Sequence, residues 1–242
     1  AVRLIGIATI PQDASPDGTV IGGLSGLDYD PRTGDWYAIS DDRSEHGVAR
    51  FYRMRIDYDH DRPPVVTMLA ATPLRNEQGE VFPTPGTGRE ASDAESIRVV
   101  PGSSDLIWSS EGDARDGFGP AVRRMAGDGA AWGRLPLPTS FDFDPAGRQG
   151  PRPNLSIEGL SFTDRGRRLW LSLEAPLHQD GDLSRATTGA VVRFTQLAFP
   201  SGRLVRQLAY PVEPIGPYPS GRLADNGVSE ILALDRTHLP VL

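Results

Sequence analysis

The sequence predicts an all-β fold, a β-propeller of four-stranded blades, from three observations. A strand–turn–strand unit recurs, and the same spacing of 16 residues separates its first and last polar positions in three copies, Ser25 to Asp41, Glu95 to Glu111 and Glu158 to Glu174. Successive copies start 63 to 71 residues apart, a length that accommodates one four-stranded blade. The 242 residues include 27 Gly and 22 Pro, which favours many turns and short strands over long helices.

The first two repeats are expected as follows. Residues 1–10 alternate enough to predict a strand, and a polar loop follows at 11–18. The first repeat has inner strands at 23–30 and 35–40 and outer strands at 49–58 and 65–72. A connection rich in Pro and Gly at 73–89 leads to inner strands at 95–100 and 105–110. Weaker outer strands at 121–125 and 132–137 complete the second repeat.

The third repeat is the most regular, and the fourth is cut short. After a loop at 138–154, residues 156–174 form a hairpin around the turn residues Asp164, Arg165 and Gly166, with outer strands at 189–197 and 204–210. A loop at 211–227 precedes one strand at 229–234 and the beginning of another at 239–242.

This pattern is interpreted as one domain over residues 1–242 with repeats starting near 23, 93, 156 and 227. About three and a half blades do not close a ring, so we expect an incomplete ring that a C-terminal segment of the same protein would complete. The alternative is a β-sandwich with accidental echoes.

Composition excludes several classes of function. The net charge of −7 argues against nucleic acid as a partner, and no apolar run is long enough to span a membrane. All 25 basic residues are Arg, which excludes a Schiff-base or P-loop lysine. The absence of Cys excludes thiol catalysis, Cys-ligated zinc and disulfides.

The recurring acids predict a metal site. In an antiparallel hairpin the start of the first strand and the end of the second lie at the same end, so these acids should converge at one mouth of the central channel. Clustered carboxylates need a cation or shared protons, and oxygen ligands favour Ca²⁺ or Mg²⁺. We expect a Ca²⁺ site drawn from Asp41, Asp42, Glu95, Glu111, Glu158, Glu174 and Glu230. The alternative is that these acids are solvated hairpin ends.

Three arginines lie close in sequence to these acids. Arg43 follows Asp42, Arg115 follows Glu111 at a short distance, and Arg89 precedes Glu95. Guanidinium groups beside a cation would suit a phosphate or carboxylate ligand, so these three are candidate substrate-binding residues. Surface ion pairs are the alternative.

Motifs across nearly the whole chain resemble one known family. They are the segments starting at Gly23 (GLSGLD), Ser40 (SDD), Asp93 (DAESI), Ser110 (SEG), Ser156 (SIEGL), Ser172 (SLE) and Gly227 (GVSE). Together they resemble the bacterial phytase-like family, also described as having esterase-like activity of phytase. The resemblance implies a β-propeller, a secreted or periplasmic protein and hydrolysis of phosphoesters or carboxylesters.

The first functional hypothesis is therefore an exported, cation-dependent hydrolase of a small phosphoester or ester. Ca²⁺ would polarise a phosphoryl oxygen, the arginines would neutralise charge, and Glu95 or Glu158 would act as general base. Two alternatives remain open. One is a calcium-dependent lactonase or arylesterase, and the other is a non-catalytic propeller that binds a ligand or a protein.

Overall fold

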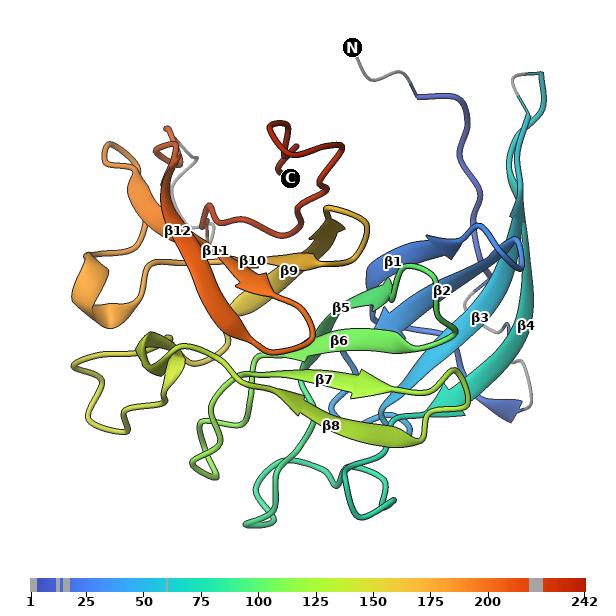
Figure 1. Ribbon diagram of the computed structural model, residues 1–242, viewed down its shortest axis with the longest axis horizontal. Helices are drawn as coiled ribbons and strands as arrows, with labels where there is room; N and C mark the ends of the chain where they lie inside the picture. The colour runs from blue at the N-terminus through green and yellow to red at the C-terminus, as the bar shows by residue number, and fades with distance from the viewer. Residues whose placement is uncertain (1–3, 12–13, 15–17, 60, 218–223) are drawn as a thin grey trace.

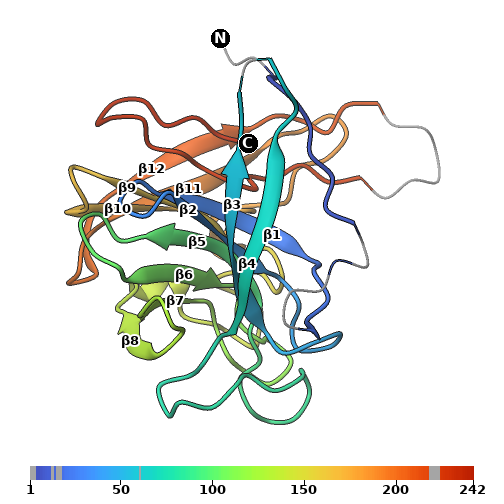
Figure 2. The same cartoon turned by 90° about the vertical axis from the view of Figure 1, so that its right-hand side faces the viewer.

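The computed structural model describes residues 4–11, 14, 18–59, 61–217 and 224–242 and confirms the all-β prediction. It contains three four-stranded antiparallel sheets, and in each one the strands pair in the order in which they follow one another in sequence. We call these sheets blade 1, blade 2 and blade 3. Figure 1 shows blade 2 between the other two. In the view turned by 90°, the β3–β4 hairpin stands upright, whereas the strands of blades 2 and 3 run across (Figure 2).

The strands lie close to their predicted positions. Blade 1 comprises β1 (Leu24–Asp30), β2 (Asp35–Ser40), β3 (Arg50–Asp57) and β4 (Val65–Pro73). Blade 2 comprises β5 (Ala94–Val99), β6 (Leu106–Ser110), β7 (Ala121–Met125) and β8 (Ala131–Leu135). Blade 3 comprises β9 (Ile157–Thr163), β10 (Arg168–Leu173), β11 (Ala190–Ala198) and β12 (Arg203–Val212).

Among the described residues, helix is limited to the 3-10 residue Gly18 and to two short 3-10 turns in the loops that flank the β9–β10 hairpin, η2 (Thr139–Phe141) and η3 (His178–Asp180). In the described part of the chain, no helix is both long enough and apolar enough to cross a membrane.

Apolar side chains fill the spaces between neighbouring blades. Between blades 1 and 2 the buried cluster includes Ile39, Phe51, Ile97 and Trp108. Between blades 2 and 3 it includes Ile107, Val122, Leu160 and Leu171. Neighbouring blades therefore bury their facing surfaces against each other, which is the reason a single blade would not be stable alone.

The first strand of each blade is the innermost. Successive innermost strands are joined by hydrogen bonds in which a side chain of one strand accepts from a backbone N–H of the next. The bonds are Val99 N–H to Asp28 Oδ2 (2.8 Å), Leu160 N–H to Ser96 Oγ (3.2 Å) and Ala233 N–H to Ser161 Oγ (2.8 Å). Glycine allows the close approach: a Cβ at Gly26 would lie 2.6 Å from the backbone oxygen of Glu95, and one at Gly159 would lie 2.9 Å from the backbone nitrogen of Ile231.

The predicted strand at residues 1–10 is wrong for its described part. Residues 4–10 form no strand, and Leu4 and Ile7 are 75% and 72% exposed. Residues 1–3 lie outside the described chain. Alternation of side chains supports a strand only where a neighbouring strand pairs with its backbone groups, and no such partner lies beside residues 4–10 in the part that is described.

The fourth repeat, which we call the fourth unit (residues 227–242), also differs from its prediction. The two segments expected as strands meet in a single bridge between Ile231 and Val241. Backbone hydrogen bonds such as Ser229 N–H to Leu242 O and Leu232 N–H to Pro240 O continue the pairing without forming regular strands. The unit still packs on blade 3, since Val228 and Ile231 share a buried cluster with Trp170 and Phe194.

One face of blade 1 is covered in part by the N-terminal segment, since Ile10, Ala14 and Ile21 pack on Ala38, Tyr52 and Met54. Leu27 occupies the repeat position of Ile97, Leu160 and Ile231, which are buried by the preceding blade at no more than 1% exposure. Leu27 is 44% exposed, because in the described chain no blade covers the innermost strand of blade 1 on this face.

Candidate metal centre

The two ends of each inner hairpin are joined as the spacing of 16 residues predicts. The backbone N–H of the last residue donates to a carbonyl two positions before the first polar residue in all three blades. The bonds are Asp41 to Gly23 (2.8 Å), Glu111 to Asp93 (2.8 Å) and Glu174 to Ser156 (2.7 Å). Strand pairing thus fixes the acids at one end of the innermost strands, where the three blades meet.

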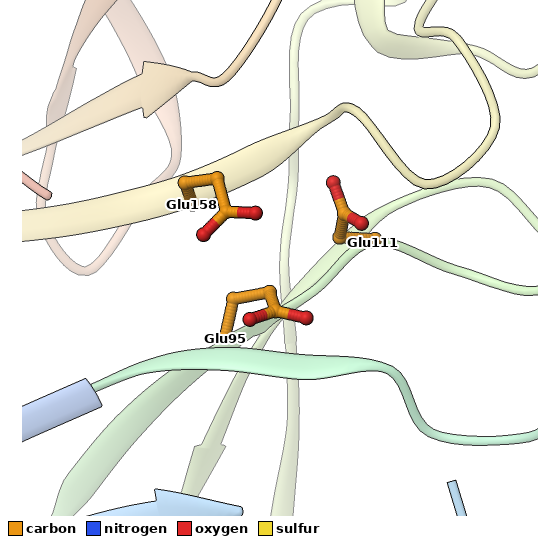
Figure 3. A group of neighbouring side chains, drawn as sticks. All are labelled: Glu95, Glu111 and Glu158. Atoms are coloured by element: carbon orange, nitrogen blue, oxygen red, sulfur yellow. The ribbon is translucent and has the colours of Figure 1, made fainter. Parts of the chain in front are cut away.

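Three of the predicted ligands face one another. Glu95 lies on β5, Glu111 directly follows β6, and Glu158 lies on β9 (Figure 3). One carboxylate oxygen from each residue lies within 4.8 Å of those of the other two. We call these residues the glutamate trio. It draws two carboxylates from blade 2 and one from blade 3.

Two members of the trio are held in place by hydrogen bonds. The Ser25 hydroxyl of blade 1 donates to Glu95 Oε2 at 2.5 Å. Glu111 Oε1 accepts the backbone N–H of Ser156, which begins the next blade. Both bonds cross between blades, so the positions of these carboxylates depend on how the blades pack.

The electrostatics of the trio disfavour three negative charges. Burial, with the neighbouring carboxylates adding to it, raises the pKa of Glu158 to about 9 and that of Glu111 to about 8. Burial also raises the pKa of Glu95 to about 7, although the hydrogen bond from Ser25 opposes the shift. The cluster therefore carries shared protons at neutral pH, or it binds a cation.

Asp41 and Glu174, the other hairpin-end acids, adjoin the trio. The charge of Glu174 contributes to the raised pKa of each trio member, and burial raises its own pKa to about 6. Asp41 is exposed and lines a pocket of about 410 Å³ together with Glu95 and Arg43. This pocket gives a ligand access from solvent to one side of the trio.

Sequence reasoning missed two acids beside Arg43. Asp93 is 5% exposed, and its carboxylate lies 3.6 Å from Arg43. Asp113 is fully buried and lies 3.5 Å from the same guanidinium. Asp93 could have been identified from the sequence, because it stands two residues before Glu95 at the start of the hairpin. Asp113 could not, because it reaches Arg43 only through the fold of the loop after β6.

Asp42 and Glu230 are engaged by arginines. Asp42 Oδ2 pairs with Arg50 at 2.8 Å, and its Oδ1 accepts the backbone N–H groups of Glu45 and His46. Glu230 pairs with the buried Arg98 at 2.5 Å. Neither acid belongs to the trio, and a ligand role for either stays a prediction.

The three arginines predicted to bind substrate lie in different places, and only one of them lines the pocket. Arg43 lines the pocket beside Asp41 and Glu95. Arg89 pairs with Glu80 at 2.6 Å on the surface, where both side chains are 56% exposed. Arg115 is exposed in the loop after β6, and its guanidinium would be 3.4 Å from a Cβ at Gly86.

The donor set fits a hard divalent cation. All three trio groups are carboxylates, they are close enough to share one ion, and a bound positive charge would relieve the repulsion that raises their pKa values. Oxygen donors of this kind suit Ca²⁺ or Mg²⁺. The residues present are therefore compatible with the predicted calcium site.

Comparison with known families identifies the chain. The model of a family described as "Phytase-like: Esterase-like activity of phytase" matches residues 19–242. No curated protein matches the chain.

Proposed function

The chain belongs to the phytase-like family, and from this premise we propose that it is a cation-dependent hydrolase of ester bonds, with phosphoesters as the favoured substrates. The family description refers to phytase and to esterase-like activity, both of which are hydrolyses of esters. The observation that carries the proposal is the glutamate trio next to an open pocket that contains an arginine.

Calcium is the proposed cofactor, and its proposed ligands are drawn from Glu95, Glu111 and Glu158. Asp41 and Glu174 adjoin the trio and would add negative charge around it. A divalent cation at such a site supplies Lewis acidity to an ester oxygen. A secreted or periplasmic location is proposed together with the calcium site, because calcium is more abundant outside the cytosol than inside it.

Glu95 is the favoured general base. It lines the pocket, where a water can reach its carboxylate. The hydroxyl of Ser25 holds one of its oxygens, so Glu95 would act as base through the other oxygen and would leave Glu111 and Glu158 as the ligands of the cation. Glu158 is the second candidate, since it belongs to the same cluster.

Arg43 is the proposed anchor for the charged part of the substrate. Its contacts with Asp93 and Asp113 are long, at 3.6 and 3.5 Å, and its Nε is buried without a hydrogen-bond partner. A guanidinium with unused donors in a pocket beside a carboxylate cluster is suited to bind a phosphoryl group.

A neutral ester is the second candidate substrate, because the family description names an esterase-like activity. A calcium-dependent lactonase or arylesterase would use the same trio and would not need Arg43. A propeller that binds a ligand without catalysis is the remaining alternative.

One set of assays distinguishes these proposals. An aryl phosphate, an aryl carboxylester and a lactone are each offered to the protein with Ca²⁺ and after chelation. We expect calcium-dependent hydrolysis of the aryl phosphate. Hydrolysis of only the carboxylester or the lactone would replace the phosphatase proposal. Inactivity on all three substrates, despite calcium binding, would favour the non-catalytic propeller.

The exposed innermost strand of blade 1 supports a further proposal, that additional blades of the same protein pack beside Leu27. The equivalent faces of blades 2 and 3 are covered by their neighbours, whereas Leu27 remains 44% exposed. The intact mass of the protein isolated from its source tests this. A mass near 26.2 kDa in a stable monomer would contradict it.

A further inference from the structure

Arginines without a carboxylate partner gather at one end of blade 3. Most arginines of the described chain lie within 4.0 Å of a carboxylate, and the protein as a whole is acidic. Among the described residues the exceptions are Arg75, Arg115, Arg152, Arg165, Arg168, Arg203 and Arg206. Four of these seven, Arg165, Arg168, Arg203 and Arg206, lie where the β9–β10 and β11–β12 turns meet.

Strand register places three of these arginines on one face. Arg168 pairs with Ala198, which pairs in turn with Arg203, so the two arginines stand two strands apart, about 10 Å. Trp170, Gln196 and Arg206 form the next row on the same face. An irregularity in the β11–β12 pairing after Arg203 brings Arg206 to the same side.

A pocket lies on this face. It has a volume of about 300 Å³ and is lined by Thr163, Asp164, Arg168, Gln196, Arg206 and Arg236. Asp164 is its single acid, and this carboxylate is shared by Arg236 and by Arg167. The lining therefore carries an excess of positive charge that no described residue neutralises.

Arg206 is held in position before any ligand binds. Its guanidinium lies 5.0 Å from the ring centroid of Trp170, and its Nε donates to Oε1 of the buried Gln196 at 3.2 Å. Ordering an arginine side chain costs conformational entropy, and here no carboxylate offsets that cost. An ordered cation without a counter-ion is suited to bind an anion, because less entropy is lost when it binds.

We propose that the pocket formed by Arg168, Arg206 and Arg236 is a binding site for a phosphate group, separate from the glutamate trio. Planar guanidinium groups match the oxygens of a phosphoryl group, and several of them around one hollow would hold a dianion. Three arginines against one acid in the lining suit a ligand with more than one negative charge, such as two linked phosphoryl groups.

The site is remote from the trio. Glu158 lies near the start of β9, whereas Asp164 follows its end, and six residues of extended strand span about 20 Å. The ligand would bind at the opposite end of the blade from the proposed catalytic pocket. It follows that the two sites can be tested independently.

The test uses pyrophosphate with protein from which cations have been removed by chelation, so that the trio holds no ion that would attract it. Calorimetry of the unaltered chain is compared with Arg168→Ala and Arg206→Ala, and with Arg75→Ala as a control. Arg75 is an exposed arginine in the connection after β4 that also lacks a carboxylate partner. We expect saturable binding that each pocket variant weakens about tenfold or more, since each removes a charge-assisted contact. The Arg75 variant should bind as the unaltered chain does.

Unfolding of each variant by urea shows whether it remains folded, and Arg206→Lys separates the charge from the guanidinium geometry. Cosedimentation with phosphatidylglycerol vesicles, against phosphatidylcholine vesicles, tells a lipid headgroup from a soluble phosphate. Loss of vesicle or pyrophosphate binding in the pocket variants alone supports the site. The absence of binding to both probes, or an equal loss in the Arg75 variant, would overturn it.

Discussion

Glu111 and Ser156 belong to neighbouring blades, and the carboxylate of Glu111 accepts the backbone N–H with which blade 3 begins. The same carboxylate belongs to the glutamate trio. The proposed cation site and the junction between blades 2 and 3 therefore share a residue. A cation drawn to the trio would act on the packing of these two blades as well as on the chemistry of the pocket.

The first prediction concerns cation affinity. Glu158→Gln keeps the shape of the side chain and removes one of the three charges, so we expect calcium affinity to fall about tenfold or more. Calorimetry on the chelated protein measures it. Glu80→Gln is the control, because Glu80 is exposed and its partner is Arg89 on the surface. Equal calcium affinity of the two variants would show that Glu158 is not a ligand of the cation.

The second prediction concerns the pH dependence of stability. The pKa values of about 7, 8 and 9 for Glu95, Glu111 and Glu158 exceed the usual value near 4.5. The folded state therefore binds more protons than the unfolded state between about pH 4.5 and about pH 9. The free energy of unfolding of the chelated protein should therefore be greatest near pH 5 and fall as the pH rises to 9.

Calcium should reverse this trend, because a bound cation stabilises the ionised carboxylates. Thermal unfolding from pH 5 to pH 9, with calcium and with a chelator, provides the comparison. The two plots of Tm against pH, with calcium and with the chelator, should converge at low pH and diverge above pH 7. Parallel curves would mean that the trio does not titrate as a cation site.

The hairpins were predictable from sequence because their spacing has a simple geometric cause. Sixteen residues accommodate two short strands and a turn, so Glu95 and Glu111 had to lie at the same end. The bonds that close the hairpins confirm this for all three blades. What the spacing did not reveal is which acids have an arginine beside them. Asp42 meets Arg50 through strand β3, and Glu230 meets Arg98 across the innermost strands.

The remaining differences also arise from contacts between distant parts of the chain. Asp113 reaches Arg43 through a loop whose path no local pattern indicates. Residues 4–10 show strand-like alternation, yet they form no strand because pairing requires a neighbour. The arginine pocket of blade 3 depends on the register of β11 and β12, which a sequence does not specify at the level of single residues.

The third prediction separates a structural role of Asp42 from a ligand role. Burial opposes ionisation of Asp42, but the hydrogen bonds from Arg50 and from the backbone N–H groups of His46 and Glu45 lower its pKa overall. Asp42→Asn leaves the buried Arg50 without its counter-ion and should cost about 3 kcal/mol of stability in urea unfolding. Calcium affinity of the folded variant should stay within about twofold of the unaltered chain. A large loss of affinity would instead make Asp42 a ligand.

The fourth prediction concerns the approach of the fourth unit to blade 3. Gly159→Ala would place a Cβ against the hydroxyl of Ser172 and 2.9 Å from the backbone nitrogen of Ile231. We expect a loss of about 1–3 kcal/mol in urea unfolding, typical of overpacking in a core. Gly22→Ala is the matched control, since nothing lies within 4 Å of its Cβ position. A similar stability of both variants would show that the fourth unit shifts without cost.

The fifth prediction tests whether Arg43 selects a charged substrate. If its guanidinium binds a phosphoryl group, Arg43→Ala should lower kcat/KM for an aryl phosphate about tenfold or more and leave that for an uncharged aryl ester nearly unchanged. Arg62→Ala, which removes a surface partner of Asp57, controls for net charge. Arg43 also faces the carboxylates of Asp93 and Asp113, so its loss would leave these acids without their cation. An equal fall for both substrates would therefore assign Arg43 to holding Asp93 and Asp113 in place, because only direct contact with a phosphoryl group distinguishes the two esters.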